Sequence, residues 1–484
     1  MAWFSFFSPA KDTNTRSPQE ANIFFTNTLS GKKERFVPLK PGTASLYSCG
    51  PTVYGPQHIG NLRAAVFADT IGRTLLFAGY HVRRVINITD VGHLVDDADL
   101  GEDKMSVGAR RDRVSPAEVA ERYTKRYLGD IRALNVDTGH IFFPRATEYI
   151  KEQIAMIQTL EQKGLVYRLA DGAYFDTEKF SRYGALGNIM AVELREGARV
   201  KAVAGKKNPH DFVLWRSATA RDLQQWDSPW GRGNPGWSIE CSAMSRALLG
   251  IEIDVHSGGI EHIPVHHNNE IAQSEGASGR TFVRYWLHNA HLMIAGEKIS
   301  KSLGNTYLLS DVTERGYPPL ALRYFFHQAH YRTQLSFSWE ALAGAAEALG
   351  RLGRIAREVA EESKGKTEKS EARDRFVAAM YDDLATPQAL GILWETLRDD
   401  DYSAEEKWGL LKDADALLGL RAAEAADLPP AELPEEVREL LSGRDEARKA
   451  KDFERADELR TELENRGYRV DDGPEGTLLT KRPE

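Results

Sequence analysis

Residues 44–61, ASLYSCGPTVYGPQHIGN, decide the expected fold and contain one of only two cysteines in the chain. The segment 44–49 is typical of a short buried strand, which ends where Gly50-Pro51 breaks regular structure. After this turn, apolar residues recur at steps of three and four up to position 78, which predicts a helix with one apolar face. The alternating segment 81–89, HVRRVINIT, predicts a second strand. Because strand, helix and strand in this order form a βαβ unit, we expect an α/β protein that begins with a parallel sheet.

The pattern downstream divides the chain into further regions. A long helix from 146 to 164, followed by hairpin-like strands, predicts an insertion into the sheet domain. The sheet is expected to resume near Trp237 and again at 283–294. The region after it is almost entirely helical, and a Pro-rich acidic linker then precedes one charged helix, 442–467, and a final hairpin. We therefore expect the two halves of one sheet domain over residues 1–142 and 226–317, the insertion over 143–225, the helical region over 318–426, and the linker with a small C-terminal unit over 427–484.

Length and composition indicate a multidomain globular protein. At 484 residues the chain is too long for one ordinary core, and its net charge of −8 gives no global signal for nucleic acid, although a local basic face would suffice. No apolar run reaches the ~18 residues of a membrane span, and Pro9 interrupts the apolar N-terminus, so we expect neither a membrane segment nor a signal peptide. Two cysteines are too few for a disulfide framework and favour a cytoplasmic protein.

Both cysteines belong to a candidate metal set that also includes His266 and Glu270. These last two residues are four positions apart and would share one face of a helix, whereas His267 would lie beside an apolar residue and is the poorer candidate. Two thiolates, an imidazole and a carboxylate suit tetrahedral zinc. The spacing of Cys49 and Cys241 does not decide the matter, because free cysteines are commonly small buried apolar residues and His266 could be an ordinary core histidine.

Two motifs suit phosphate binding. The tetrapeptide 58–61, HIGN, lies where the first strand turns into the helix, and a helix N-terminus with a glycine admits an anion closely. Residues 296–305, GEKISKSLGN, combine Lys298 and Lys301 with small hydroxyl residues, as a mobile phosphate clamp would. A solvated basic loop is the alternative for this second motif, since exposed lysines are common.

Taken in order, these motifs resemble the HIGH and KMSKS signatures of class I aminoacyl-tRNA synthetases, and their flanks resemble cysteinyl-tRNA synthetases. The matching blocks are CGPTVYGPQHIGN, NITDV, DFVLW, PGWSIECSAM, HHNNEIAQSE and EKISKSLGN. The resemblance runs from about Asn27 to the final hairpin. It implies a Rossmann-like parallel-sheet catalytic domain split by an inserted connective domain, then an α-helical stem and anticodon-binding bundle, and a small C-terminal α+β unit that binds tRNA.

The resemblance also implies a reaction and a set of site residues. The reaction is ligation of L-cysteine to the 3′ end of cysteine tRNA through a cysteinyl-adenylate, with ATP and magnesium as co-substrate, by a protein that we expect to be a monomer. One zinc would distinguish cysteine from serine, because a thiolate is its preferred partner. The implied metal ligands are Cys49, Cys241, His266 and Glu270. The implied charge-stabilising residues are His58, Asn61, Lys298 and Lys301. The implied ATP contacts are His58, Gly60, Glu261 and Lys301. Thr89 and Trp237 are implied to line the cysteine pocket, with an ordinary strand threonine and core tryptophan as the alternatives.

Several positions depart from the family pattern. Asn61 stands where the HIGH signature ends in histidine, and Ile299 stands for the methionine of KMSKS. Within HSGGIEHIPVHH, Ser257 replaces a glycine and Glu261 an aspartate, which puts its contact with the ATP ribose in doubt. The acidic run after Thr89 carries extra residues, so the sequence does not show which carboxylate takes the usual role.

Other readings remain open at this point. A ligase that joins cysteine to an amino sugar in mycothiol synthesis would share both signatures but lack residues 427–484. A catalytically silent paralogue that binds nucleotide or RNA is the rival from another class, although it would have no reason to keep every candidate residue. The basic residues of the charged helix form either a solvated face or a surface for an RNA backbone. They are Arg444, Arg448, Lys449, Lys451, Arg455 and Arg460.

Overall fold

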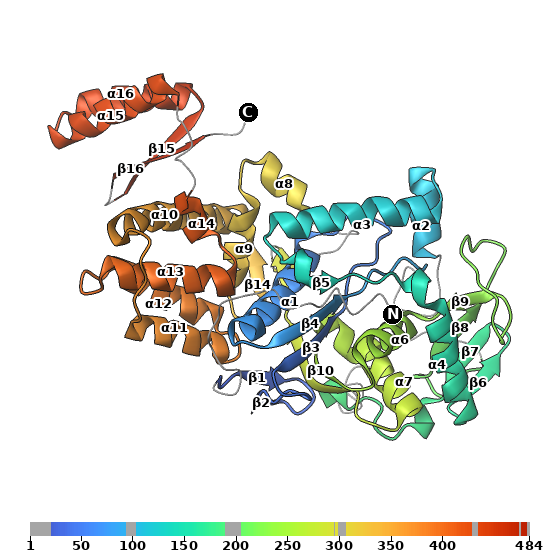
Figure 1. Ribbon diagram of the computed structural model, residues 1–484. Coiled ribbons are helices and arrows are strands. Elements are labelled where there is room, and N and C mark those ends of the chain that lie inside the picture. The colour runs from blue at the N-terminus through green and yellow to red at the C-terminus, as the bar shows by residue number, and fades with distance from the viewer. Residues whose placement is uncertain are drawn as a thin grey trace.

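A five-stranded parallel sheet organises the first part of the molecule (Figure 1). The computed structural model describes residues 21–92, 103–188, 205–294, 296–298, 306–427, 434–473 and 476–481. The strand order is β11-β10-β3-β4-β5, and every pairing is parallel. The strands are β3 (Thr43–Ser48), β4 (His81–Ile86), β5 (Ile141–Phe142), β10 (Ile253–Gly259) and β11 (Val283–Asn289). The predicted βαβ start is confirmed, with helix α1 (Ile59–Phe77) as the crossover.

Helices cover both faces of this sheet, as parallel sheets require. Strand β10 is buried at every position because it lies between two neighbours and two helical layers. Side chains alternate along each strand, so Leu46 packs with Ile71 of α1 on one face, and Tyr47 packs on the opposite face. On that opposite face lie α6 (Trp237–Leu249) and α7 (Asn268–Ser278). The carboxyl ends of β3 and β10 are adjacent, because Ser48 pairs with Ser257.

A second, antiparallel sheet is inserted between β5 and α6 in the sequence. Its order is β6-β7-β8-β9, and the expected hairpin is its first pair. The helix predicted from 146 to 164 is α4, preceded by a short 3₁₀ turn. The bounds are α4 (Ile150–Gln162), β6 (Val166–Leu169), β7 (Gly172–Phe175), β8 (Phe212–Ser217) and β9 (Gly233–Pro235).

The prediction that the central sheet resumes near Trp237 is wrong. Trp237 is the first residue of helix α6, and the sheet resumes only at β10. The predicted strand 283–294 is in fact two strands, of which only β11 belongs to the central sheet. The second, β12 (Leu292–Ile294), forms a three-stranded sheet with β13 (Glu297–Lys298) and β14 (Leu335–Phe337). Apolar runs of this kind do not reveal which sheet a strand joins.

The expected helical region is confirmed and shares its core with the part of the chain that contains the central sheet. Leu62 of α1, Ile131 of α3 and Leu322 of α9 lie in the same buried cluster as Leu411 of α13. The helices outside the sheet layers are α2 (Lys104–Asp112), α3 (Pro116–Ala133), α8 (Leu309–Glu314), α9 (Pro319–His327), α10 (Trp339–Ser363), α11 (Glu371–Tyr381), α12 (Thr386–Arg398), α13 (Ala404–Leu418) and α14 (Ala422–Asp427). An antiparallel pair, β1 (Phe24–Asn27) and β2 (Lys32–Arg35), precedes the central sheet.

A buried ion network joins helix α1 to these helices. Asp69 lies in the middle of α1 and accepts from Arg84 at 3.0 Å, Arg323 at 2.7 Å and Arg73 at 2.6 Å. Arg323 also donates to the carbonyl oxygens of Leu134, at the end of α3, and of Leu418, at the end of α13. Helix ends leave carbonyl groups without intrahelical partners, and this guanidinium satisfies two such ends at once.

The C-terminal unit has a core of its own, built from Val437, Leu463, Tyr468 and Val470. The prediction of one charged helix is wrong, because two helices flank a break at Lys451, which adopts a φ of 60°. They are α15 (Glu435–Lys449) and α16 (Phe453–Asn465), and the predicted hairpin follows as β15 (Tyr468–Gly473) and β16 (Gly476–Lys481).

Arg444 is buried in this unit, which contradicts its interpretation as part of a solvated or RNA-facing surface. Most of the predicted linker lies outside the described residues. The five domain boundaries stay a prediction. Among the helices that the structure describes, none is long and apolar enough to cross a membrane.

Candidate active site and metal centre

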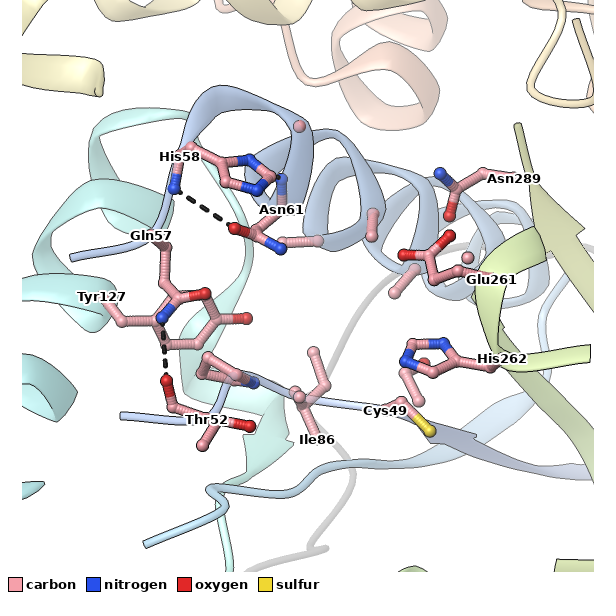
Figure 2. A pocket seen from close by; sticks show the side chains of 18 of the residues that line it. Cys49, Thr52, Gln57, His58, Asn61, Ile86, Tyr127, Glu261, His262 and Asn289 are labelled. Carbon is pink, nitrogen blue, oxygen red and sulfur yellow. Dashed lines mark hydrogen bonds between the residues drawn. The ribbon is translucent and has the colours of Figure 1, made fainter. Parts of the chain in front are cut away.

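A cavity of about 360 Å³ lies at the carboxyl end of the central sheet, where β3, β10 and the start of α1 converge (Figure 2). Ligands of open parallel sheets bind at this edge, because the loops that follow the strands meet there. The chain turns sharply out of β3 at Gly50, where a Cβ atom would lie only 1.6 Å from the carbonyl oxygen of Asn87. The predicted site residues that line the cavity are Cys49, His58, Gly60, Asn61, Trp237 and Glu261.

The HIGN motif forms the first turn of α1 at the edge of the cavity. His58 is the N-cap residue, and its Nδ1 accepts a hydrogen bond from the backbone N–H of Asn61 at 3.2 Å. In return, the side-chain oxygen of Asn61 accepts from the backbone N–H of His58 at 3.2 Å. An imidazole that accepts at Nδ1 carries its proton on Nε2 when neutral. Asn61 therefore closes a reciprocal cap that orients the His58 ring, with the partly positive helix end beside the cavity.

Directly beside the cavity the structure brings together the four predicted metal ligands. Their donor atoms, from Cys49, Cys241, His266 and Glu270, all lie within 4.8 Å of one another. Cys49 follows β3, Cys241 lies within α6, and Glu270 is in the first turn of α7. His266 belongs to a π-helical turn over Ile263–His267, and its Nε2 is 3.2 Å from a carboxylate oxygen of Glu270. The one donor that also lines the cavity is Cys49.

Neighbouring side chains orient these donors in the manner of a metal centre. The hydroxyl oxygen of Ser238 lies 3.2 Å from Nδ1 of His266, and Nε2 of His256 lies 3.0 Å from the second oxygen of Glu270. Nε2 of His266 is buried and has no hydrogen-bond partner among the described residues, although it faces the other donors. Metal-bound histidines are held through their other nitrogen in this way, so the residues fit a bound divalent metal.

Electrostatics within the cluster favour anionic ligands. A hydrogen bond from Cys49 lowers the pKa of Cys241 to about 7, while burial raises the pKa of Cys49 well above its ordinary value. Burial also opposes the charged form of Glu270, but His256 and His266 outweigh it and lower the pKa of this carboxyl to about 2. Burial disfavours protonation of His266, yet Cys241 and Glu270 raise its pKa to about 10. A cation that replaces this proton would meet a thiolate and a carboxylate already paired with positive charge.

His267 is closer to the cluster than helical counting predicts. The expected position of His267 beside an apolar residue stays a prediction, but its Nε2 also lies 3.3 Å from the sulfur of Cys49. Its Nδ1 lies 2.7 Å from Nε2 of His288. A second possible donor set therefore shares Cys49 and Glu270 with the first and adds His256 and His267. His267 is the last residue of the π-helical turn that directly precedes α7.

The two residues predicted for the cysteine pocket differ in position. Trp237 lines the cavity, and its ring centroid is 4.4 Å from that of His266. Thr89 does not line the cavity; it is buried behind the wall, and its hydroxyl donates to Glu240 at 3.2 Å. Its backbone nevertheless supports the wall, because its N–H donates to the carbonyl oxygen of Pro51.

The predicted phosphate-binding residues are described only in part. Glu261 lines the cavity, and its carboxylate is 3.4 Å from His291. Lys298 is the last residue of β13, and Lys301 lies outside the described residues. The chain after this segment is described again at the HIGN motif, where the carbonyl oxygen of Tyr307 accepts from the backbone N–H of Ile59.

Two residues of the cavity wall were missed by sequence reasoning. Lys104 lies 5.7 Å above the ring of Trp237, and the preceding Asp103 caps α2 by accepting from Ser106. His262 lines the cavity on the side of Cys49 (Figure 2). Each of the two residues lies in a segment that departs from the family pattern, so the resemblance gave no role for either side chain.

Comparisons with known proteins agree with this architecture. Residues 35–347 match the family model described as "tRNA synthetases class I (C) catalytic domain". Among solved structures, one match is Mycobacterium tuberculosis methionyl-tRNA synthetase in complex with methionyl-adenylate. The match covers 80% of this chain and 93% of that chain, with a TM-score of 0.56 and 16% identity. The Agrobacterium radiobacter ternary complex titled LeuRS-tRNA-LeuAMS covers 82% and 87%, with a TM-score of 0.57 and 12% identity. At these identities the likeness concerns the fold alone. Fold and family model together define a class I aminoacyl-tRNA synthetase.

Closer relatives narrow the class to one family. Cysteine–tRNA ligase from Treponema denticola is 43% identical over 477 residues, which covers 92% of this chain and 97% of that protein. Cysteine–tRNA ligase 1 from Burkholderia lata is 45% identical over 457 residues, covering 94% and 96%. Residues 431–477 match the "Cysteinyl-tRNA ligase anticodon binding domain". The chain belongs to the cysteine–tRNA ligase family.

Proposed function

We propose that this protein ligates L-cysteine to the 3′ end of cysteine tRNA in two steps within the cavity. The observation that carries the proposal is the position of Cys49, which is at once a donor of the buried metal set and part of the cavity wall. A substrate in the cavity can thereby reach the metal donors on one side and the HIGN helix end on the other. The amino-sugar ligase is not favoured, because residues 431–477 match an anticodon-binding model.

The donor set would hold one zinc ion. When bound, zinc supplies a Lewis acid that stabilises a thiolate far better than a serine hydroxyl, so cysteine is selected without an editing step. Packing alone distinguishes such similar side chains weakly. Cys49, Cys241, His266 and Glu270 hold the ion, and Ser238 orients His266.

The first step forms cysteinyl-adenylate from cysteine and ATP with magnesium. The carboxylate of cysteine attacks the α-phosphorus, and pyrophosphate leaves. His58 donates through Nε2 to the phosphate oxygens, because its Nδ1 is already bonded to Asn61. Lys301 and Lys298 add positive charge. Support for Lys301 comes from the described chain that follows it, since the carbonyl oxygen of Tyr307 accepts from the backbone N–H of Ile59 at the start of α1.

In the second step, a terminal hydroxyl of the tRNA attacks the carbonyl carbon of the adenylate, and AMP leaves. Gly60 and Glu261 contact the nucleotide, and Trp237 lines the amino-acid end of the cavity. We propose that Thr89 acts indirectly, by fixing the wall at Pro51, because its side chain does not reach the cavity. The helices from α10 onward and the C-terminal unit bind the tRNA, and the protein acts as a cytoplasmic monomer.

Aminoacylation of total tRNA with radiolabelled cysteine, ATP and magnesium tests the proposal. Acid-precipitable, base-labile radioactivity supports it, and radiolabelled serine in a parallel reaction should give background incorporation. Cysteine-dependent pyrophosphate exchange without charging would contradict the tRNA step and indicate another acceptor. Absence of both reactions in zinc-loaded protein would contradict the enzyme assignment and favour a silent paralogue.

A further inference from the structure

Lys104 is a cation of the cavity wall with no role in the proposed mechanism. It is the first residue of α2, and its side chain is partly exposed where it lines the cavity. Among the described residues that line the cavity, it is the one lysine or arginine. Its ammonium group lies 5.7 Å from the centroid of the Trp237 ring, and no carboxylate of the described residues forms an ion pair with it. The cavity therefore contains an accessible positive charge that the protein itself leaves unpaired.

Helix α2 lies along the wall that leads from the metal donors to the HIGN motif. At its start, Lys104 lies over Trp237, whose ring centroid is 4.4 Å from that of His266 in the donor set. Further along, α2 packs against Tyr54, because a Cβ atom on Gly108 would lie 2.9 Å from the carbonyl oxygen of Tyr54. Tyr54 also lines the cavity and belongs to the loop that connects β3 to the HIGN motif. Lys104 is therefore at the end of this wall that is nearer to the metal donors.

The local structure fixes the position of Lys104 but gives its charge no stabilising role in α2. The buried Asp103 caps the helix by accepting from the backbone N–H of Ser106. Gly92 leaves the space that the Asp103 carboxylate fills, because a Cβ atom there would lie only 1.4 Å from one of its oxygens. A cation in the first turn of a helix faces the positive end of the helix dipole, which is unfavourable. An anion in the cavity therefore explains this lysine better than the stability of its helix does.

The chemistry of the substrates identifies the anion. Under the proposed function, the sulfur of cysteine lies at the metal donors, while its carboxylate must reach the α-phosphorus of ATP on the side of the HIGN motif. The carboxylate consequently lies between these two ends of the cavity, along the wall that α2 supports. The phosphates of ATP are the other anions, but they lie beside His58, at the opposite end from Trp237 and Lys104.

We propose that the ammonium group of Lys104 forms an ion pair with the α-carboxylate of bound L-cysteine. The inference rests on the proposed function and adds a substrate-binding residue to it. The ion pair holds the carboxylate in place while the metal donors hold the sulfur, so that a carboxylate oxygen faces the α-phosphorus.

Calorimetric binding of two ligands to zinc-loaded protein tests the ion pair. The ligands are L-cysteine and cysteamine, which keeps the thiol and the ammonium group but lacks the carboxylate. We expect Lys104→Met, which keeps an apolar stem without the charge, to weaken L-cysteine binding by roughly tenfold or more and to change cysteamine binding by less than about twofold. The variant should thereby lose most of the preference of the wild type for L-cysteine over cysteamine. The KM for ATP in cysteine-dependent pyrophosphate exchange should stay unchanged.

Two further variants separate the ion pair from a structural effect. Lys104→Arg keeps the cation and should recover most of the affinity for L-cysteine. Lys412→Met is the matched control, because Lys412 of α13 lies 5.3 Å from the ring centroid of Trp408, outside the cavity. This control should bind both ligands as the wild type does. Zinc content, measured by mass spectrometry, should be equal in all four proteins.

Three results would overturn the inference. Equal losses for both ligands would show a disturbed site, and an unchanged affinity for L-cysteine would exclude the ion pair. A raised KM for ATP without weaker L-cysteine binding would assign Lys104 to the nucleotide instead. A wild-type protein that binds no L-cysteine would overturn the proposed function itself, and the inference with it.

Discussion

Single polar side chains fix the orientation of two histidine rings, one at each end of the cavity. Ser238 holds the His266 ring by its outer nitrogen, and Asn61 holds the His58 ring by Nδ1. In both cases a hydrogen bond to Nδ1 fixes the direction in which Nε2 of the imidazole points. Each of the two polar side chains therefore fixes the orientation of a neighbouring histidine.

Ser238→Ala should weaken zinc binding by about 10- to 100-fold, because the His266 ring loses the group that orients it. Competition with a chromophoric chelator measures the affinity. Ser242→Ala is the matched control, since Ser242 lies on the same buried face of α6 but bonds to Gln273. Equal losses in both variants would show that α6 itself is disturbed and would contradict the specific role of Ser238.

Asn61→Ala should slow cysteine-dependent pyrophosphate exchange by roughly tenfold or more, because the His58 ring is no longer held at its productive angle. Loss of the cap should also lower the free energy of unfolding by about 1 kcal/mol. Ser115→Ala removes an equivalent reciprocal cap from α3 and should cause the same loss of stability with full activity. Equal exchange rates in the two variants would remove Asn61 from the mechanism.

At the scale of helices and strands, local features were predictable from the sequence, whereas contacts between distant elements were not. Strand β3, helix α1 and the HIGN turn are local features, so periodicity and turn chemistry predict them. The metal set required the family resemblance, because Cys49 and Cys241 are brought together only by the packing of α6 beside β3. The contact between His267 and Cys49 was not predictable, since it joins residues 218 positions apart through the packing of separate elements. Likewise, the charge pattern predicts one helix, but the chain breaks into two helices at Lys451, which adopts a positive φ.

Asp69→Asn should lower the free energy of unfolding by about 3 to 5 kcal/mol, because it leaves three arginines around α1 without their shared carboxylate. Burial opposes the charged form of Asp69, but Arg323, Arg73 and Arg84 hold its pKa well below the ordinary value. Its contribution is therefore complete above a pH of about 4 and is lost as the pH falls below that value.

Denaturant unfolding at pH 7 and at pH 3 checks both statements about Asp69. The difference between variant and wild type should shrink at the lower pH. Asp382→Asn, which removes a half-exposed partner of Lys33, is the control and should change the free energy of unfolding by less than about 0.5 kcal/mol. A loss for Asp69→Asn no greater than this control would contradict the prediction.

At the scale of the whole molecule, the buried clusters separate activation from tRNA binding. One continuous core joins α1 to the helices as far as α14, whereas the C-terminal unit packs around Val437, Leu463, Tyr468 and Val470 alone. Among the described residues, the apolar side chains of this unit do not belong to the larger cluster. The helical region from α9 to α13, in contrast, is bound into the catalytic part through Arg323 and cannot be removed in the same way.

Truncation after residue 433 should therefore impair tRNA charging at least tenfold while leaving cysteine-dependent pyrophosphate exchange within about twofold of the full chain. The ratio of the two rates measures the effect, and the unfolding temperature of the truncated protein is the control for its integrity. Similar losses in both reactions would contradict the independence of the C-terminal unit.

The metal donors come from three distant parts of the chain, and this has a consequence for how the protein is made. A zinc finger gathers its ligands locally and can load metal as soon as a short segment exists. Here Cys49 is synthesised first, and the whole inserted sheet is synthesised before Cys241, His266 and Glu270. Under the proposed function, metal binding would consequently be a late event in synthesis. An ion could bind to all four donors only after the two halves of the central sheet, which the insertion separates in sequence, have folded together.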